Sequence, residues 1–150
     1  MDETGKGRDL GSDSSKTLAE TVLQTINSIV LVANAKGEIL YASPSVKAIL
    51  GYEPEDLLGM KYWNTPSPDP ELRKKHFQRI AAIARGEEPV ADAPYAVKML
   101  TREGEERWIL WRDARATGDL LIGAGQDVTE LRRTQEELKR REEEISIRAG

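Results

Sequence analysis

The sequence has no cysteine among its 150 residues and only one histidine. The missing thiols exclude a disulfide framework, a thiolate nucleophile and a cysteine-based zinc site. The formal net charge of −4 argues against a basic surface for nucleic acid. No apolar run approaches the roughly 20 residues of a membrane span, and the polar start "MDETGKGRDLGSDSS" differs from a signal peptide. We therefore expect a cytoplasmic chain with no nucleic-acid partner and no membrane span.

Composition and periodicity divide the chain into four segments: residues 1–14, 15–28, 29–127 and 128–150. The first is polar and rich in Gly and Ser, which predicts a disordered tail. In the second, Leu18, Val22 and Ile26 recur at helical spacing and predict an amphipathic helix. The third holds the apolar segments of one folded core, and the fourth is a highly charged helix.

The first half of the core contains two strands and then helices. Two β-branched runs flank "NAKGE", which predicts a hairpin with Gly37 in its turn. Ser43 is expected to cap the following helix, with Pro44 at its first position and Gly51 in the left-handed conformation after its end. A longer helix begins at Asp69 after a Pro-rich loop.

This longer helix is expected to end at Gly86 and to turn its apolar residues inward: Leu72, Phe77, Ile80, Ala81 and Ala84. After it, "YAVKML", "ERWILWRDARA" and "DLLIGAGQD" have the composition of strands and are joined by the turns "TREGEE" and "TGD". Five strands predict one antiparallel sheet. Short helices on one face of that sheet make an α+β domain with a cleft between the two layers.

The order and spacing of three stretches carry a resemblance to a known family: "ILVANAKGEILYASPSVKAILGYEPEDLLGMKYW", "LTREGEERWILWR" and "IGAGQDVTE". Together they resemble a PAS domain with its associated C-terminal motif, as found in sensor histidine kinases of two-component systems. The resemblance covers about residues 17–130 and implies a PAS fold with flanking N- and C-terminal helices. It also implies a non-catalytic sensor module that acts on a downstream effector in the same chain, such as a histidine kinase or a cyclase.

The family closes its last strand with a "DxT" motif that starts an output helix, and Asp127 and Thr129 occupy those positions. Asp and Thr side chains accept hydrogen bonds from the unpaired N–H groups of a helix start. The resemblance implies a signal-relay role for these two residues. The alternative is that both are ordinary helix caps.

The C-terminal helix has a heptad seam with the spacing 3-4-3-4-3, formed by Val128, Leu131, Gln135, Leu138, Glu142 and Ile145. Pairs four residues apart, Glu136 with Arg140 and Glu137 with Arg141, favour the helix. We predict a homodimer through the flanking helices, with a seam formed by Leu18, Val22, Ile26, Leu131, Leu138 and Ile145. A solvated single helix is the alternative, because only two heptads are present.

Cofactor chemistry has little support in these residues. Flavin-photoadduct and cysteine-linked chromophore PAS domains are excluded, and Gly125 occupies the position of the family's flavin-contacting glutamine. His76 is the only candidate haem ligand, but its position does not match that of haem-binding relatives. We expect a solvated surface histidine at this place, and we predict neither a cofactor nor a metal.

Three tryptophans and two glycines suggest where a cavity lies. Trp108 and Trp111 are three positions apart on a strand and therefore face opposite sides. Gly123 and Gly125 permit close approach of a ring or a ligand. The candidate lining residues are Tyr62, Trp63, Phe77, Ile80, Trp108, Gly123 and Gly125.

No catalytic motif is present: the sequence has no P-loop, no HExxH, no Rossmann glycine pattern and no plausible Ser/His/Asp arrangement. Two functions remain open. The module senses a small molecule and relays its state to the C-terminal helix, or it is an interaction and dimerisation domain with a filled core and no ligand.

Overall fold

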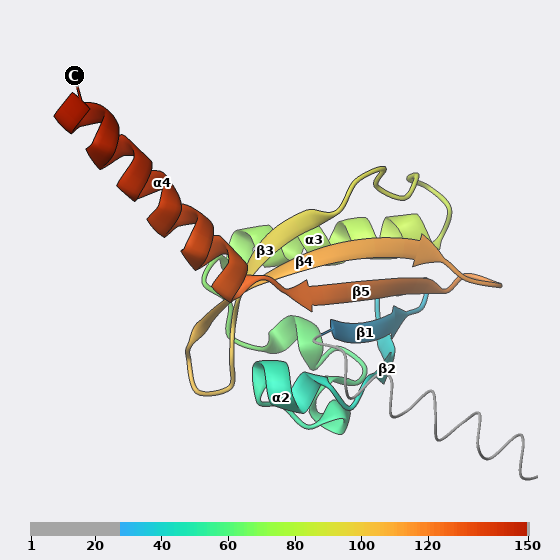
Figure 1. The fold of residues 1–150 in the computed structure, drawn as a ribbon. Helices are drawn as coiled ribbons and strands as arrows, with labels where there is room; N and C mark the ends of the chain where they lie inside the picture. Colours follow the sequence, from blue (N-terminus) through green and yellow to red (C-terminus); the bar gives the residue numbers. More distant parts are fainter. Residues whose placement is uncertain (1–27, 150) are drawn as a thin grey trace, which may run out of the picture.

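The computed structural model describes residues 28–149, which form an α+β domain followed by one long helix (Figure 1). The predicted tail and the predicted helix of Leu18, Val22 and Ile26 lie outside the described residues. The elements follow in the order β1 (Ser28–Ala33), β2 (Ile39–Ala42), α2 (Val46–Leu50), η1 (Pro54–Leu57), η2 (Tyr62–Asn64), α3 (Pro70–Ala84), β3 (Tyr95–Leu100), β4 (Glu106–Arg115), β5 (Leu121–Asp127) and α4 (Thr129–Ala149). Ser28, predicted as the last residue of the preceding helix, already pairs with Gln126 in the sheet.

The predicted five-stranded antiparallel sheet is confirmed, and its strand order is β2-β1-β5-β4-β3. The first and the last strands of the core are therefore neighbours at the centre of the sheet. Along β1, Ile29, Leu31 and Ala33 are buried and alternate with less buried residues, as a strand with one covered face requires. These residues share one core with buried side chains of α2 and α3, so the helices cover a single face of the sheet.

The predicted β1–β2 hairpin is confirmed, with Gly37 at a positive φ of 80°. The side chain of Asn34 accepts hydrogen bonds from the backbone of Lys36 and Glu38 and so shapes the turn. The Trp63 indole donates a hydrogen bond to the Gly37 carbonyl. This bond ties the turn to η2.

The predicted cap of the next helix is wrong at Ser43. Helix α2 begins at Val46, and the buried Ser43 hydroxyl instead accepts a hydrogen bond from the Val30 amide at 2.8 Å. The hydroxyl also pairs with that of Ser45, so it closes the end of the hairpin rather than capping a helix. Gly51 lies in the left-handed conformation after the helix, as predicted.

Helix α3 begins as predicted, because the Asp69 carboxylate accepts a hydrogen bond from the Leu72 amide at 3.1 Å. The inward position predicted for Leu72 is wrong, since this side chain is 49% exposed. Arg73 takes the inward position instead and donates hydrogen bonds to the Tyr62 carbonyl and the Thr65 hydroxyl. Its guanidinium also lies over the Tyr62 ring, which explains how a charged residue replaces an apolar one here.

Gly125 is the glycine of the sheet interior whose backbone lies closest to neighbouring side chains. A Cβ at this position would lie 2.7 Å from Cγ2 of Ile109 and 2.8 Å from Cε3 of Trp111. Both side chains are buried, so an added methyl would force one of them or the strand itself to shift. The glycine therefore makes the room that the Trp111 ring occupies.

We predict that Gly125→Ala lowers the free energy of unfolding by about 1–3 kcal/mol, because the added methyl overpacks the core. Urea denaturation followed by tryptophan fluorescence measures this change. Ala124→Ser is the control, because it adds one heavy atom to the neighbouring exposed residue. Equal stability losses for the two variants would contradict this account of Gly125.

Candidate functional site

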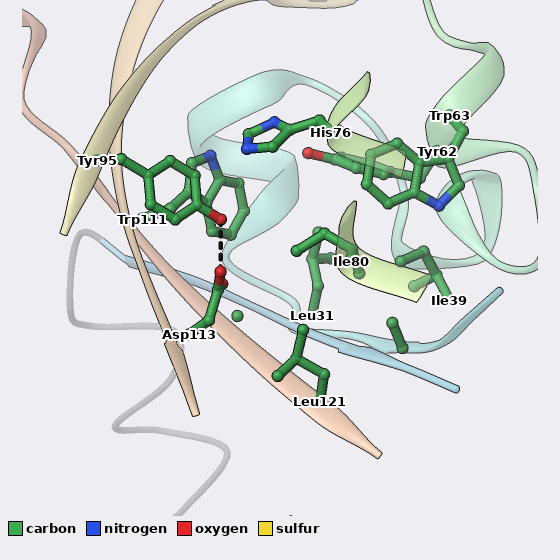
Figure 2. A pocket seen from close by; sticks show the side chains of 12 residues that line it. Leu31, Ile39, Tyr62, Trp63, His76, Ile80, Tyr95, Trp111, Asp113 and Leu121 are labelled. Atoms are coloured by element: carbon green, nitrogen blue, oxygen red, sulfur yellow. Dashed lines mark hydrogen bonds between the residues drawn. The ribbon is translucent and has the colours of Figure 1, made fainter. Parts of the chain in front are cut away.

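A cavity of about 40 Å³ lies between the sheet and helix α3 (Figure 2). Its floor comes from β1, β2, β4 and β5, and its other walls come from η2, α3 and β3. The lining residues are Leu31, Ala33, Ile39, Tyr62, Trp63, His76, Ile80, Tyr95, Trp111, Asp113, Leu121 and Gly123. Most of this wall is apolar, which is typical of a small-molecule site that places a few polar groups precisely.

Four of the predicted lining residues line this cavity: Tyr62, Trp63, Ile80 and Gly123. The other three do not. Gly125 lies beneath the Trp111 ring, and the Phe77 ring packs edge-on against Trp63 at 5.3 Å, outside this cavity.

The choice of Trp108 as a lining residue is wrong, because its side chain lies on the opposite face of the sheet. Trp111 pairs with Gly125 and faces the cavity, so alternation along β4 turns Trp108 away. The general prediction that the two tryptophans face opposite sides is confirmed.

Asp113 and Tyr95 form the polar centre of the cavity, and neither was singled out from the sequence. The Tyr95 hydroxyl donates a hydrogen bond of 2.7 Å to the Asp113 carboxylate (Figure 2). Burial raises the pKa of Asp113, and burial together with this bond raises the pKa of Tyr95. The period-two pattern through Ile109 and Trp111 is the sequence signal that could have placed Asp113 on the inward face.

His76 lies in the cavity wall, so the expectation of a solvated surface histidine is wrong. Its ring contacts the Tyr95 ring edge-on, with centroids 5.1 Å apart. Burial lowers the pKa of His76, and the positive charges of Arg79 and Arg73 lower it further. The imidazole is therefore neutral near pH 7, with one nitrogen able to accept a hydrogen bond.

Tyr62 adds a hydroxyl to the same space. The residue is 7% exposed, and in Figure 2 its hydroxyl points toward His76. Burial raises the pKa of Tyr62. Within residues 28–149 this hydroxyl makes no hydrogen bond, so its bonding capacity is directed at the cavity itself.

A second site joins the sheet to helix α4. The Thr129 hydroxyl accepts a hydrogen bond from the Trp108 amide at 2.8 Å and donates one to the Asp127 carboxylate at 2.6 Å. The Asp127 carboxylate also accepts a bond from the Thr129 amide. Asp127 thus caps the helix start, whereas the buried Thr129 hydroxyl bonds to the sheet rather than to the helix.

Trp108 holds the start of α4 through its backbone and through its ring. The Trp108 carbonyl accepts a hydrogen bond from Val128, so both backbone groups of Trp108 bond to residues 128 and 129. The guanidinium of Arg132 stacks on the Trp108 ring, 3.9 Å from its centroid. Arg107 approaches the Asp127 carboxylate at 3.9 Å. The first turn of α4 is therefore attached to β4 at several points.

Beyond this turn, α4 leaves the body of the domain (Figure 1). The predicted seam residues Leu131, Leu138 and Ile145 are 56%, 52% and 65% exposed. Arg141 bonds to Glu137 at 2.8 Å as predicted. The helix thus presents an apolar row that the described part of this chain does not cover.

The comparison with protein families agrees with this geometry. A family model described as the PAS fold matches residues 23–133, which is most of the chain. The chain belongs to the PAS family. No curated protein matches it significantly.

Solved PAS structures share the fold of this PAS domain at low sequence identity. The PAS domain of the Cronobacter turicensis RpfR quorum-sensing receptor, in complex with C12:0, is 20% identical with a TM-score of 0.53; the match covers 69% of this chain and 95% of that one. The PAS domain of an HTR-like protein from Haloarcula marismortui is 16% identical with a TM-score of 0.57, covering 77% and 98%. A sensory box histidine kinase/response regulator from Burkholderia thailandensis E264 is 24% identical with a TM-score of 0.54, covering 80% and 91%.

Two further features of residues 28–149 bear on the site. In this part of the PAS domain, no group of three or more His, Asp or Glu residues is placed to hold a metal ion. None of the described helices is long and apolar enough to cross a membrane.

We predict that the free energy of unfolding falls by up to about 1 kcal/mol as the pH drops from 7.5 to 5.5 because of His76. The folded pKa lies below the unfolded value, so acid protonates the unfolded chain first and favours it. Because His76 is the only histidine, His76→Gln should remove this contribution.

Urea titrations of the wild type and the variant at each pH measure the effect. The raised pKa of Asp113 changes the free energy of unfolding with pH in the opposite direction. Because Asp113 is present in both proteins, the difference between the two curves isolates the contribution of His76. Parallel curves would contradict the placement of His76 in the cavity wall.

Proposed function

We propose that this PAS domain is a non-catalytic sensor module that binds a small molecule in its cavity and relays the occupied state to α4. The observation that carries the proposal is the position of β4. This strand lines the cavity with Trp111 and Asp113, and its residue Trp108 holds the start of α4. One strand thus contacts both sites.

The geometry of that strand supports a relay. A ligand that contacts Asp113 or Trp111 shifts β4 against β5, since these two strands pair through Trp111 and Gly125. A small shift changes the alignment of the Trp108 amide with the Thr129 hydroxyl. The Asp127–Thr129 junction is then a two-state contact whose equilibrium the ligand biases.

The solved relatives support a ligand and an effector. One has a bound C12:0, and another belongs to a sensory box histidine kinase/response regulator. By this analogy, α4 leads to a downstream effector in the same chain, such as a histidine kinase or a cyclase. No cofactor enters the proposal, and a cytoplasmic location remains a prediction.

The exposed row of α4 supports homodimerisation as the route of output. Leu131, Leu138 and Ile145 repeat every seven residues along one face of the helix. Pairing with the same row of a second copy buries them and aligns two effectors. A domain that only dimerises and binds no ligand is the alternative function.

We predict that equilibrium dialysis against a cellular small-molecule extract enriches at least one compound on the wild-type protein, detected by mass spectrometry after denaturation. Gly123→Val should abolish the enrichment. A Cβ at Gly123 is in ordinary contact with Asp113 and Trp111, so the added methyl groups fill the cavity.

Ala124→Val is the matched control, because Ala124 is an exposed neighbour on the same strand. It should retain the compound, and sedimentation should show both variants in the wild-type oligomeric state. If no compound depends on an open cavity, the sensing function is wrong and the dimerisation-only alternative stands.

A further inference from the structure

The polar groups of the cavity offer more hydrogen-bond acceptors than donors. Asp113 presents a carboxylate, and the Tyr95 hydroxyl already donates its proton in a hydrogen bond to this carboxylate. The neutral imidazole of His76 offers an acceptor nitrogen, and the Tyr62 hydroxyl is unpaired within residues 28–149. A ligand that satisfies this wall has to bring several donors and few acceptors.

The charge of the cavity is also unbalanced. Asp113 is 9% exposed, and no Lys or Arg in the described part of the chain forms an ion pair with it. Arg79 acts on Asp113 only to oppose the rise of its pKa. A buried carboxylate without an ion-pair partner is unfavourable for folding, and such groups cluster at functional sites.

The remaining wall suits a small cation. Trp111 and Tyr95 place aromatic rings beside the carboxylate (Figure 2), and aromatic faces attract ammonium groups. Gly123 has no side chain, which leaves the space above Asp113 open. A volume of about 40 Å³ is roughly that of three buried water molecules, so the occupant has only a few non-hydrogen atoms.

We propose that the cavity takes a small organic cation, a primary alkylammonium, whose N–H groups bond to Asp113, Tyr62 and His76. The proposal rests on the sensing function above and names the chemistry of its ligand. An ammonium group supplies three donors and the missing positive charge together. A carboxylate ligand would be repelled by Asp113, because both groups are negatively charged.

Three probes of similar size test this assignment: propylammonium, 1-propanol and acetate, each titrated into ¹⁵N-labelled protein at constant ionic strength. The reporters are the Trp111 indole and the amides of Asp113 and Gly123. Propylammonium should give saturable shifts, with a Kd at least about tenfold below that of 1-propanol. Acetate should give none.

Asp113→Asn keeps the size of the side chain and should weaken propylammonium binding by at least about tenfold. Asp119→Asn removes an exposed carboxylate elsewhere and should leave the Kd unchanged. If Asp113→Asn does not fold, Tyr62→Phe removes a single hydroxyl, and with it one acceptor for the ammonium group, and should raise the Kd.

Equal or tighter binding of acetate or 1-propanol, an unchanged Kd in both cavity variants, or no saturable shift with any probe would each overturn the assignment. The dialysis experiment with Gly123→Val decides the sensing function separately, since it makes no assumption about charge. A compound of another class enriched there would keep the sensor and reject the cation.

Discussion

The hydrogen bond from the Trp108 amide to the Thr129 hydroxyl is the contact on which the connection between sheet and helix depends. It joins β4 to the C-terminal helix, and its acceptor is buried, because Thr129 is 3% exposed. A buried amide that loses its acceptor is unfavourable by about 1–3 kcal/mol. The start of α4 therefore cannot leave β4 without a substantial free-energy change, although most of the helix extends away from the described part of the domain (Figure 1).

The cavity depends on the same two strands. Glycines at positions 123 and 125 of β5 leave room for Trp111 and for the space above Asp113. Larger side chains there would fill the cavity or displace the tryptophan. Since β4 also carries Trp108, the packing that opens the cavity and the bonding that holds the helix are properties of a single strand pair.

Sequence periodicity was sufficient for the architecture and insufficient for the site. The strands, the Gly37 turn and the Asp69 cap follow from local rules that the fold does not override. Alternation separated Trp108 from Trp111 but could not say which faces the helices, because that depends on the pairing of Trp111 with Gly125. The inward place of Arg73 and the burial of His76 likewise depend on partners from other elements, Tyr62 and Tyr95.

The most direct test of the relay is the amide exchange of Arg132, whose N–H makes the first hydrogen bond of α4 to Val128. Exchange is measured by NMR with and without Gly123→Val, which mimics an occupied cavity, in three backgrounds: wild type, Thr129→Val and the core control Ile49→Val. If β4 relays the state of the cavity, filling the cavity should change the opening free energy at Arg132 by roughly 0.5–2 kcal/mol in the wild type and in Ile49→Val, and should leave it unchanged in Thr129→Val. An equal change in all three backgrounds would show that Thr129 is only a structural contact and would contradict the relay.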